Sequence, residues 1–264
     1  MRTISILFLT TFFFASCGGG SPNSVNQVTN SASPVSPVNG TSQTVNTTAP
    51  DGVILVGTFL ESATPNSPAL LLLHQWQSDR HSYDDFAKRM QAKGFNVLAI
   101  DGRGFGESVK TTDGKSISPS RTDEAVKAML GDVGAAFDFL SKQKNVDPNK
   151  IGVVGASYGS SLALIYAADN PKVAAVALLS PGLNYFGNMP TEPAVKKYGN
   201  RPLYLIAAED DPESAGAVRK LAAAAAKDDR SQMTIYDKGG HGSGLFAAKV
   251  GLDDVLEQFF SKNL

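Results

Sequence analysis

Short apolar runs alternate with amphipathic segments from residue 51 to residue 264, and this alternation limits the possible folds more than any other feature. The runs lack a regular apolar–polar alternation, which is typical of parallel strands that are covered on both faces. Gly52 opens a segment that we expect to form an antiparallel edge strand or a hairpin, up to residue 60. The six runs that follow are residues 69–73, 97–100, 151–154, 173–179, 203–208 and 233–236.

Segments with helical spacing lie between several of these runs. Apolar residues stand at i, i+3, i+4 and i+7 within residues 83–90, and similar spacing recurs within 126–137 and 252–260. Strands that alternate with helices in this way predict an α/β domain with a doubly wound, mostly parallel sheet. We therefore expect residues 51–264 to fold as one such domain.

The first 50 residues differ from the rest of the chain in charge, since Arg2 is their only charged side chain. The remainder carries charged residues at the density of an ordinary soluble domain. Over the whole chain, 24 Lys and Arg balance 25 Asp and Glu. This balance argues against a nucleic-acid-binding protein and against a polybasic membrane-binding surface.

An uncharged, largely apolar run follows Arg2 and continues to Ser16. As a helix it would span about 21 Å, which is shorter than the ~30 Å hydrocarbon core of a bilayer. The run therefore predicts a signal peptide over residues 1–16, and export of the mature protein.

Cys17 is the only cysteine, so the chain cannot form an internal disulfide. The segment Phe14-Ala15-Ser16-Cys17 resembles the lipobox of bacterial lipoproteins, although Phe14 replaces the usual aliphatic residue. The resemblance implies that Cys17 is lipidated and anchors the protein to a bacterial membrane. Gly18 in place of Asp favours the outer membrane. The alternative is an ordinary signal peptide with an incidental cysteine.

Residues 18–50 contain no charge, no aromatic residue and no aliphatic side chain larger than Val. Such a segment buries too little apolar surface to offset the entropy of ordering it, so residues 17–50 are expected to form a disordered tether. A flexible chain of this length reaches about 30 Å. The domain would then work in the periplasm or outside the cell.

The sequence Gly155-Ala156-Ser157-Tyr158-Gly159 follows the run 151–154 and precedes a helical segment. The pattern G-x-S-x-G between a strand and a helix indicates a nucleophile elbow, in which small flanking residues allow a sharp turn that exposes the serine. The pattern alone is weak evidence for a nucleophile, because a chain with 25 glycines can match it by chance. Its position between a predicted strand and a predicted helix makes the evidence stronger. The alternative is that Ser157 is merely a small residue in a tight turn.

A serine nucleophile needs a base, and the chain has three histidines, of which only His241 follows Ser157. His241 lies in a glycine-rich segment between the last predicted strand and the last predicted helix. His74 is expected to have a structural role, and His81 is expected to lie on a polar surface before a helix. Three scattered histidines and one cysteine give no metal-ligand spacing, and no segment suggests a nucleotide or another cofactor.

Three carboxylates, Glu209, Asp210 and Asp211, directly follow the run 203–208. The end of a strand ahead of the histidine is the expected place for the acid that orients the base. The spacing leaves the choice among the three open.

Together with the elbow, the segments Leu72-Leu73-His74-Gln75-Trp76 and Asp101-Gly102-Arg103-Gly104-Phe105-Gly106-Glu107-Ser108 resemble the α/β-hydrolase superfamily, in its dienelactone-hydrolase and carboxylesterase branches. The resemblance extends over residues 51–264. It implies a catalytic triad of Ser157, His241 and Asp211, with Asp210 as the alternative acid. It also implies an oxyanion hole made by the backbone N–H groups of Trp76 and Tyr158, although Gln75 replaces the usual glycine.

The resemblance further implies a serine hydrolase that cleaves small carboxylic esters, lactones or thioesters and uses no cofactor. The segment 180–201 is too short for a large cap, so we expect an open site. If this segment folds over the site, the lining residues are Trp76, Tyr158, Leu183, Tyr185, Phe186 and Met189. The alternative is that the segment merely packs on the surface. Two alternatives are a serine peptidase of the same fold and a lipoprotein that keeps the fold only for binding.

Overall fold

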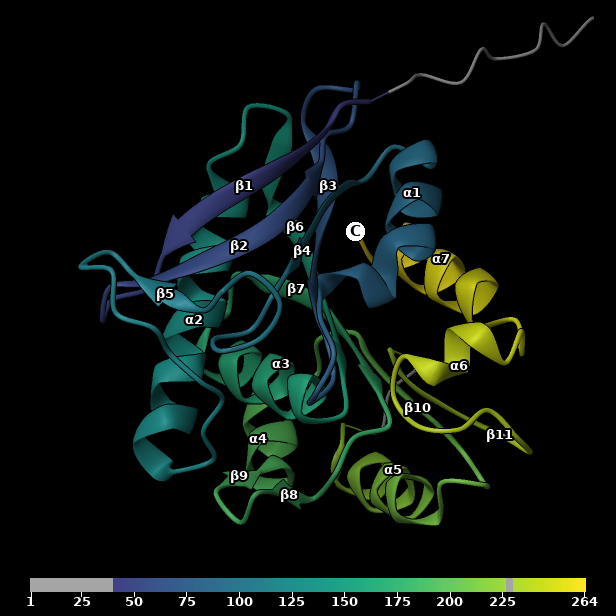
Figure 1. Ribbon diagram of the computed structural model, residues 1–264. Helices are drawn as coiled ribbons and strands as arrows, with labels where there is room; N and C mark the ends of the chain where they lie inside the picture. The colour runs from purple at the N-terminus through teal and green to yellow at the C-terminus, as the bar shows by residue number, and fades with distance from the viewer. Residues whose placement is uncertain (1–39, 227–229) are drawn as a thin grey trace, which may run out of the picture. The chain divides into compact units, whose positions relative to one another are not determined.

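The computed structural model describes residues 40–226 and 230–264 (Figure 1). The expected signal peptide, Cys17 and most of the expected tether lie outside these residues. Among the described helices, none is long and apolar enough to cross a membrane.

A mixed sheet, with the strand order β1-β2-β4-β3-β6-β7-β10-β11, forms the centre of the domain. The strands from β4 to β11 pair in parallel, whereas β2 runs antiparallel to both β1 and β4. A two-residue strand, β5 (Lys110–Thr111), also pairs with β2. The main strands are β1 (Ser42–Thr48), β2 (Val53–Leu60), β3 (Ser67–Leu73), β4 (Asn96–Ile100), β6 (Val146–Ala156), β7 (Val173–Leu179), β10 (Leu203–Ala208) and β11 (Ser231–Tyr236).

Helices cover both faces of this sheet (Figure 1). One hydrophobic core joins the sheet to α2 (Asp123–Ser141), α3 (Tyr158–Asp169), α4 (Thr191–Tyr198) and α5 (Pro212–Ala224). A second core on the opposite face joins it to α1 (Asp84–Ala92), α6 (Gly244–Ala247) and α7 (Leu252–Asn263). The short helix η1 (Arg80–Tyr83) leads into α1. This arrangement confirms the predicted doubly wound, mostly parallel α/β sheet.

The expected tether was wrong at its C-terminal end, because residues 42–48 form strand β1. This strand pairs with β2 along its whole length, from Ser42 opposite Leu60 to Thr48 opposite Ile54. The expectation counted only the apolar surface that the segment can bury. An edge strand also gains backbone hydrogen bonds from its neighbour, and Val45 packs against the core. The edge of the sheet is therefore β1 and not the segment that begins at Gly52.

No large cap covers the sheet within the described residues. The segment between β7 and β10 forms a small hairpin of β8 (Asn184–Tyr185) and β9 (Met189–Pro190), followed by α4. The sequence pattern did not predict α4, because a helix of eight residues shows too few turns to establish a periodicity. Met189 was expected to line the site, but it is fully buried in the core beside α3.

Candidate active site

Four loops meet at the carboxyl-terminal edge of the sheet, where parallel strands of this fold end and where ligands usually bind. The loop after β3 carries Gln75 and Trp76, and the turn after β6 carries Ser157. The loop after β10 carries Asp211, and the loop after β11 carries His241.

The turn from β6 into α3 holds Ser157 in a strained backbone conformation, with φ 53° and ψ −124°. Positive φ is rare for residues other than glycine and often marks functional sites. The neighbouring glycines are required by close backbone packing. A Cβ on Gly155 would lie 2.2 Å from the carbonyl oxygen of Gly159, and a Cβ on Gly159 would lie 2.6 Å from the carbonyl oxygens of Leu73 and His74. The G-x-S-x-G pattern therefore has a steric cause here.

A chain of hydrogen bonds links Ser157, His241 and Asp211. The Ser157 Oγ–H donates to His241 Nε2 at 2.8 Å, and His241 Nδ1–H donates to Asp211 Oδ2 at 2.6 Å. A carboxylate only accepts hydrogen bonds, so Asp211 keeps the imidazole proton on Nδ1 and leaves Nε2 free to accept. The structure thus brings together three side chains that sequence analysis placed in one site. A serine held in this way can lose its proton to the imidazole as it attacks an electrophile.

Asp211 is held in its charged form. Burial raises the pKa of this carboxyl, but its interactions with Ser214 and His241 outweigh burial and bring the pKa below its ordinary value. The Asp211 side chain is 14% exposed, whereas that of His241 is 43% exposed. The site therefore combines a shielded negative charge with an imidazole that a substrate can reach from solvent.

Asp210 binds backbone groups of the segment that carries His241, whereas Asp211 binds the His241 side chain. Its carboxylate accepts hydrogen bonds from the backbone N–H of Gly239 at 3.1 Å and of Gly240 at 3.0 Å. Glu209, the third carboxylate after β10, forms an ion pair with Arg219. Asp210 therefore supports the loop that carries His241, while Asp211 contacts the histidine itself.

Two further side chains hold the same loop, which we call the His241 loop (residues 239–243). The Gln75 Oε1 atom accepts hydrogen bonds from the Ser243 N–H at 2.8 Å and from the Ser243 Oγ–H at 3.2 Å. The Ser180 Oγ accepts from the Gly242 N–H at 2.8 Å. Sequence analysis noted Gln75 only as a departure from the usual glycine and did not consider Ser180. A long polar side chain at a position that usually lacks one was the available signal.

The backbone N–H groups of Trp76 and Tyr158 are the expected oxyanion donors. Tyr158 is the first residue of α3, and Trp76 lies in the loop after β3. Within residues 40–226 and 230–264, no group accepts a hydrogen bond from either N–H. Both donors are therefore left unused by the described residues. The N–H of Tyr158 also belongs to a helix N-terminus, where the backbone dipoles favour negative charge.

His74 has a structural environment. Its Nδ1–H donates to the Gln75 carbonyl oxygen at 2.7 Å, and its Nε2 accepts from the Gly102 N–H at 2.8 Å. Burial lowers the pKa of His74, so the neutral ring is favoured. With both nitrogens used, His74 joins the loop after β3 to the turn after β4. The third histidine, His81, is exposed and contacts Asp84.

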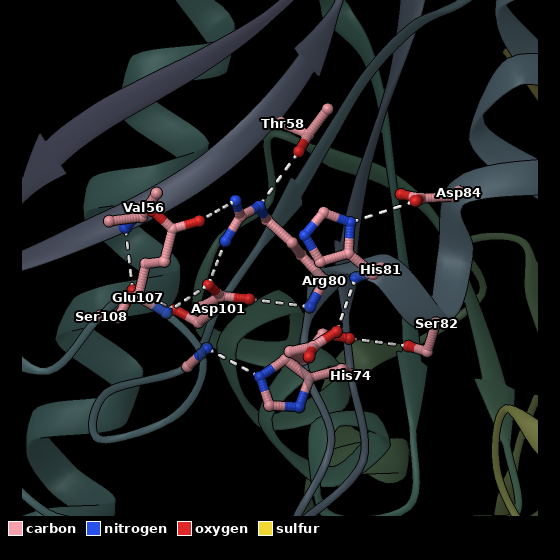
Figure 2. Close-up of polar contacts among 12 residues, drawn as sticks. Val56, Thr58, His74, Arg80, His81, Ser82, Asp84, Asp101, Glu107 and Ser108 are labelled. Carbon is pink, nitrogen blue, oxygen red and sulfur yellow. Dashed lines mark hydrogen bonds and ion pairs between the residues drawn. The ribbon is translucent and has the colours of Figure 1, made fainter.

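The turn after β4 is organised by Asp101, as Figure 2 shows. Its carboxylate accepts from the backbone N–H of Arg80 and of Glu107, each at 2.8 Å, and forms an ion pair with the buried Arg80 guanidinium. Ser108 bridges the turn to β2, because its hydroxyl donates to the Asp101 carbonyl and accepts from the Val56 N–H. This segment therefore shapes the loops around the site and takes no part in the Ser157 hydrogen-bond chain.

Aromatic rings form one wall beside the nucleophile. The Trp76 ring packs edge-on against Tyr158, with centroids 5.4 Å apart, and against Phe186 at 4.9 Å. Phe186 and Gly187 both have positive φ, 58° and 80°, in the turn between β8 and β9. This strained turn places the Phe186 ring on Trp76, so the segment between β7 and β10 contributes to the wall of the site.

The fold and the residues at the sheet edge together define an α/β hydrolase. Residues 64–201, over half of the chain, match the profile of the family described as serine aminopeptidase, S33. The chain therefore belongs to this family. The matched residues include Ser157 but end before Asp211 and His241.

Two similar proteins of known sequence are each 27% identical to this chain over the aligned residues. An uncharacterized protein of Mycobacterium tuberculosis is 27% identical over 222 residues, which is 78% of this chain and 74% of the relative. The acyltransferase DrtE of Aspergillus calidoustus is 27% identical over 164 residues, which is 58% of this chain and 51% of that enzyme.

Two solved structures show the same fold. Acetyl xylan esterase 1 of Thermoanaerobacterium sp. superposes with a TM-score of 0.70 at 17% identity, covering 87% of this chain and 86% of the esterase. Dienelactone hydrolase of Anabaena variabilis gives a TM-score of 0.66 at 18% identity, covering 86% of this chain and 99% of that structure. At these identities the similarity concerns the fold alone.

Proposed function

We propose that this protein is a serine hydrolase that cleaves carboxylic esters through an acyl-enzyme on Ser157. The hydrogen-bond chain from Asp211 through His241 to Ser157 is the observation that carries the proposal. The strained backbone of Ser157 and the unused N–H groups of Trp76 and Tyr158 support it, because they supply the other parts that acyl transfer needs.

In the proposed reaction, Ser157 Oγ attacks the ester carbonyl while its proton passes to His241 Nε2. His241 then gives this proton to the departing alcohol, and the acyl group stays on Ser157. A water molecule next transfers a proton to His241 as it attacks the acyl-enzyme. The carboxylic acid leaves, and the proton returns to Ser157.

Asp211 assists both steps, since its charge stabilises the imidazolium that forms each time. The N–H groups of Trp76 and Tyr158 would donate to the oxyanion of each tetrahedral intermediate. Backbone donors of this kind are fixed before the reaction and need no reorganisation, so they stabilise developing charge efficiently. Loss of one such donor is worth about 3 kcal/mol in related systems.

A fluorophosphonate probe tests the nucleophile directly. We expect covalent labelling of Ser157 in the full chain, located by peptide mass spectrometry, and no labelling in Ser157→Ala. Ser160→Ala is a matched control, because Ser160 is a buried serine three positions away whose hydroxyl donates to the Ser157 carbonyl. A wild-type protein that stays unlabelled while a control hydrolase reacts would favour a binding protein that merely retains the fold.

The family description favours a second candidate, a serine peptidase that removes N-terminal residues. Peptide recognition by such an enzyme requires groups that bind a free amino terminus. p-Nitrophenyl esters of increasing chain length and aminoacyl p-nitroanilides separate the two functions. We expect turnover of short esters and little turnover of the anilides, and the reverse ratio would favour the peptidase.

We also propose that Cys17 carries lipid and anchors the domain to a bacterial membrane, facing the periplasm or the cell exterior. The proposal rests on the lipobox resemblance of residues 14–17. Metabolic labelling with an alkyne fatty acid tests it. Label in the wild type and its loss in Cys17→Ser would support the anchor, whereas soluble, unlabelled wild-type protein would contradict it.

A further inference from the structure

Within the part of the chain that the structure describes, the Arg121 guanidinium has no acidic or carbonyl partner, unlike the guanidinium groups of five other arginines. Its Cζ atom lies 4.7 Å from the centroid of the Trp76 ring and 4.8 Å from that of Phe186. Within residues 40–226 and 230–264, Arg121 forms no ion pair and no side-chain hydrogen bond. Elsewhere, Arg80, Arg89, Arg103 and Arg219 pair with carboxylates, and Arg201 donates to carbonyl groups.

The position of Arg121 is fixed from two sides. The Asn188 side chain, from the hairpin of β8 and β9, donates to the Arg121 carbonyl at 3.0 Å and to the Asp123 carboxylate at 2.9 Å. The two aromatic rings hold the guanidinium itself. Because the rings pack against the guanidinium and leave its hydrogen-bond donors unused, Arg121 can bind a planar anion such as a carboxylate through two parallel hydrogen bonds.

Arg121 stands beside the proposed oxyanion hole. It rests on Trp76, whose backbone N–H is one proposed donor, and Trp76 packs on Tyr158, which carries the other. The guanidinium therefore contacts the same ring as Tyr158, the residue next to Ser157.

The strand order indicates which part of an ester would face Arg121. Ser157 follows β6, in the middle of the sheet. His241 follows β11, at one end of the strand order, whereas Trp76 follows β3, on the other side of β6, and Arg121 rests on the Trp76 ring. The departing alcohol must lie beside His241 to receive its proton. We therefore place the acyl chain away from His241, towards Trp76 and Arg121.

We propose that Arg121 binds a carboxylate on the acyl part of the substrate, so that the preferred substrates are half-esters of dicarboxylic acids. The proposal rests on the proposed ester hydrolysis at Ser157 and adds the substrate class. It makes Arg121 a specificity-determining residue that contacts substrate and takes no part in proton transfer.

Matched esters test this assignment by turnover. p-Nitrophenyl hydrogen glutarate carries a free carboxylate on the acyl side, and its methyl ester has nearly the same size without the charge. We expect Arg121→Gln to lower kcat/KM for the charged ester about tenfold and to leave the methyl ester within about twofold. The difference in the wild type should shrink as salt rises, because exposed charges are screened. Lys115→Gln removes the same charge at a side chain that is 79% exposed, and should change neither ester.

Two turnover results would overturn the proposal. An equal loss for both esters in Arg121→Gln, with a lowered Tm, would show that Arg121 only packs on the aromatic wall. Discrimination confined to an ester whose charge lies on the alcohol, such as the butyrate ester of 3-hydroxybenzoate, would contradict the acyl-side orientation.

Binding without turnover separates this proposal from the proposed function. Trp76 is the only tryptophan of the chain, so intrinsic fluorescence reports on the ring that carries Arg121. We expect monomethyl glutarate to change the fluorescence of Ser157→Ala, with about tenfold weaker binding when Arg121→Gln is added. A saturable change in a protein that fluorophosphonate does not label would support the anion site and refute the hydrolase. Fluorophosphonate labelling of the wild type without any such fluorescence change would support the hydrolase and refute the anion site at Arg121.

Discussion

Gln75→Met tests whether the side chain that replaces the usual glycine positions His241, the proposed general base. Methionine has nearly the same length as glutamine but lacks the acceptor oxygen. The change removes the hydrogen bonds from Ser243 N–H at 2.8 Å and Ser243 Oγ–H at 3.2 Å. It leaves the other supports of the His241 loop in place, namely Ser180 on Gly242 and Asp210 on Gly239.

The magnitude follows from the lost hydrogen bonds. A neutral hydrogen bond contributes about 0.5–1.5 kcal/mol, so the two contacts together hold the loop with roughly 1–3 kcal/mol. If 1–2 kcal/mol of this free energy favours the conformation in which His241 reaches Ser157, its loss lowers the ratio of competent to non-competent loop conformations about 5- to 30-fold. We expect kcat to fall by up to this factor. The effect should fall on kcat, because the substrate contacts of the aromatic wall are unchanged, and KM should stay within about twofold.

Steady-state hydrolysis of p-nitrophenyl butyrate measures both constants, and the labelling rate with fluorophosphonate gives an independent measure of Ser157 reactivity. Ser243→Ala is the matched control. It removes only the longer of the two contacts and keeps the backbone donor, so kcat should fall less than about fivefold.

Two outcomes would refute the reasoning. The first is a Gln75→Met enzyme with wild-type kcat and labelling rate, because the loop would then keep its position without Gln75. The second is a fall in kcat that Ser243→Ala reproduces in full, since the decisive contact would then be the hydroxyl and not the backbone N–H.

Three further predictions concern the acid, the pH dependence of stability and the elbow. Asp211→Asn should lower kcat by about 10³- to 10⁴-fold, because an amide no longer fixes the imidazole tautomer, whereas Asp210→Asn keeps an acceptor for the loop and should lose less than about tenfold. Equal losses in kcat for the two variants would contradict the assigned roles. Burial lowers the pKa of His74 in the native state from 6.5, so the unfolded state binds more protons below that pH. The wild-type free energy of unfolding should therefore fall as pH drops below 6.5, by at most about 1.4 kcal/mol per pH unit from this group. Urea titrations at several pH values should show that the free energy of unfolding of His74→Gln depends less steeply on pH. Identical slopes would mean that His74 protonates freely in the fold. Gly159→Ala should destabilise the protein in thermal unfolding although alanine favours helices by about 1 kcal/mol, because its Cβ would meet the Leu73 carbonyl oxygen at 2.6 Å. A raised Tm would show that this contact relaxes.

The fold class could be predicted from the sequence because these strands and helices show local patterns of apolar residues. Runs such as residues 203–208 became β10 with the same bounds, and the helical spacing around Val126 became part of α2. Strand β1 was not predicted, because it is stabilised mainly by backbone hydrogen bonds to β2 and its polar side chains show no apolar pattern. The short helix α4 escaped because its apolar residues are too few to form a pattern.

The sequence by itself determined the alternating α/β domain, the serine in a strand-to-helix turn and the single histidine that follows it. These features depend on local patterns of a few residues. Only the tertiary structure decided that Asp211 faces His241 while Asp210 holds the loop, because adjacent carboxylates differ only in the direction of their side chains. The same holds for Gln75 on Ser243 and for Arg121 on Trp76, where residues distant in the chain meet. Packing at the sheet edge creates these contacts, and no short segment encodes them.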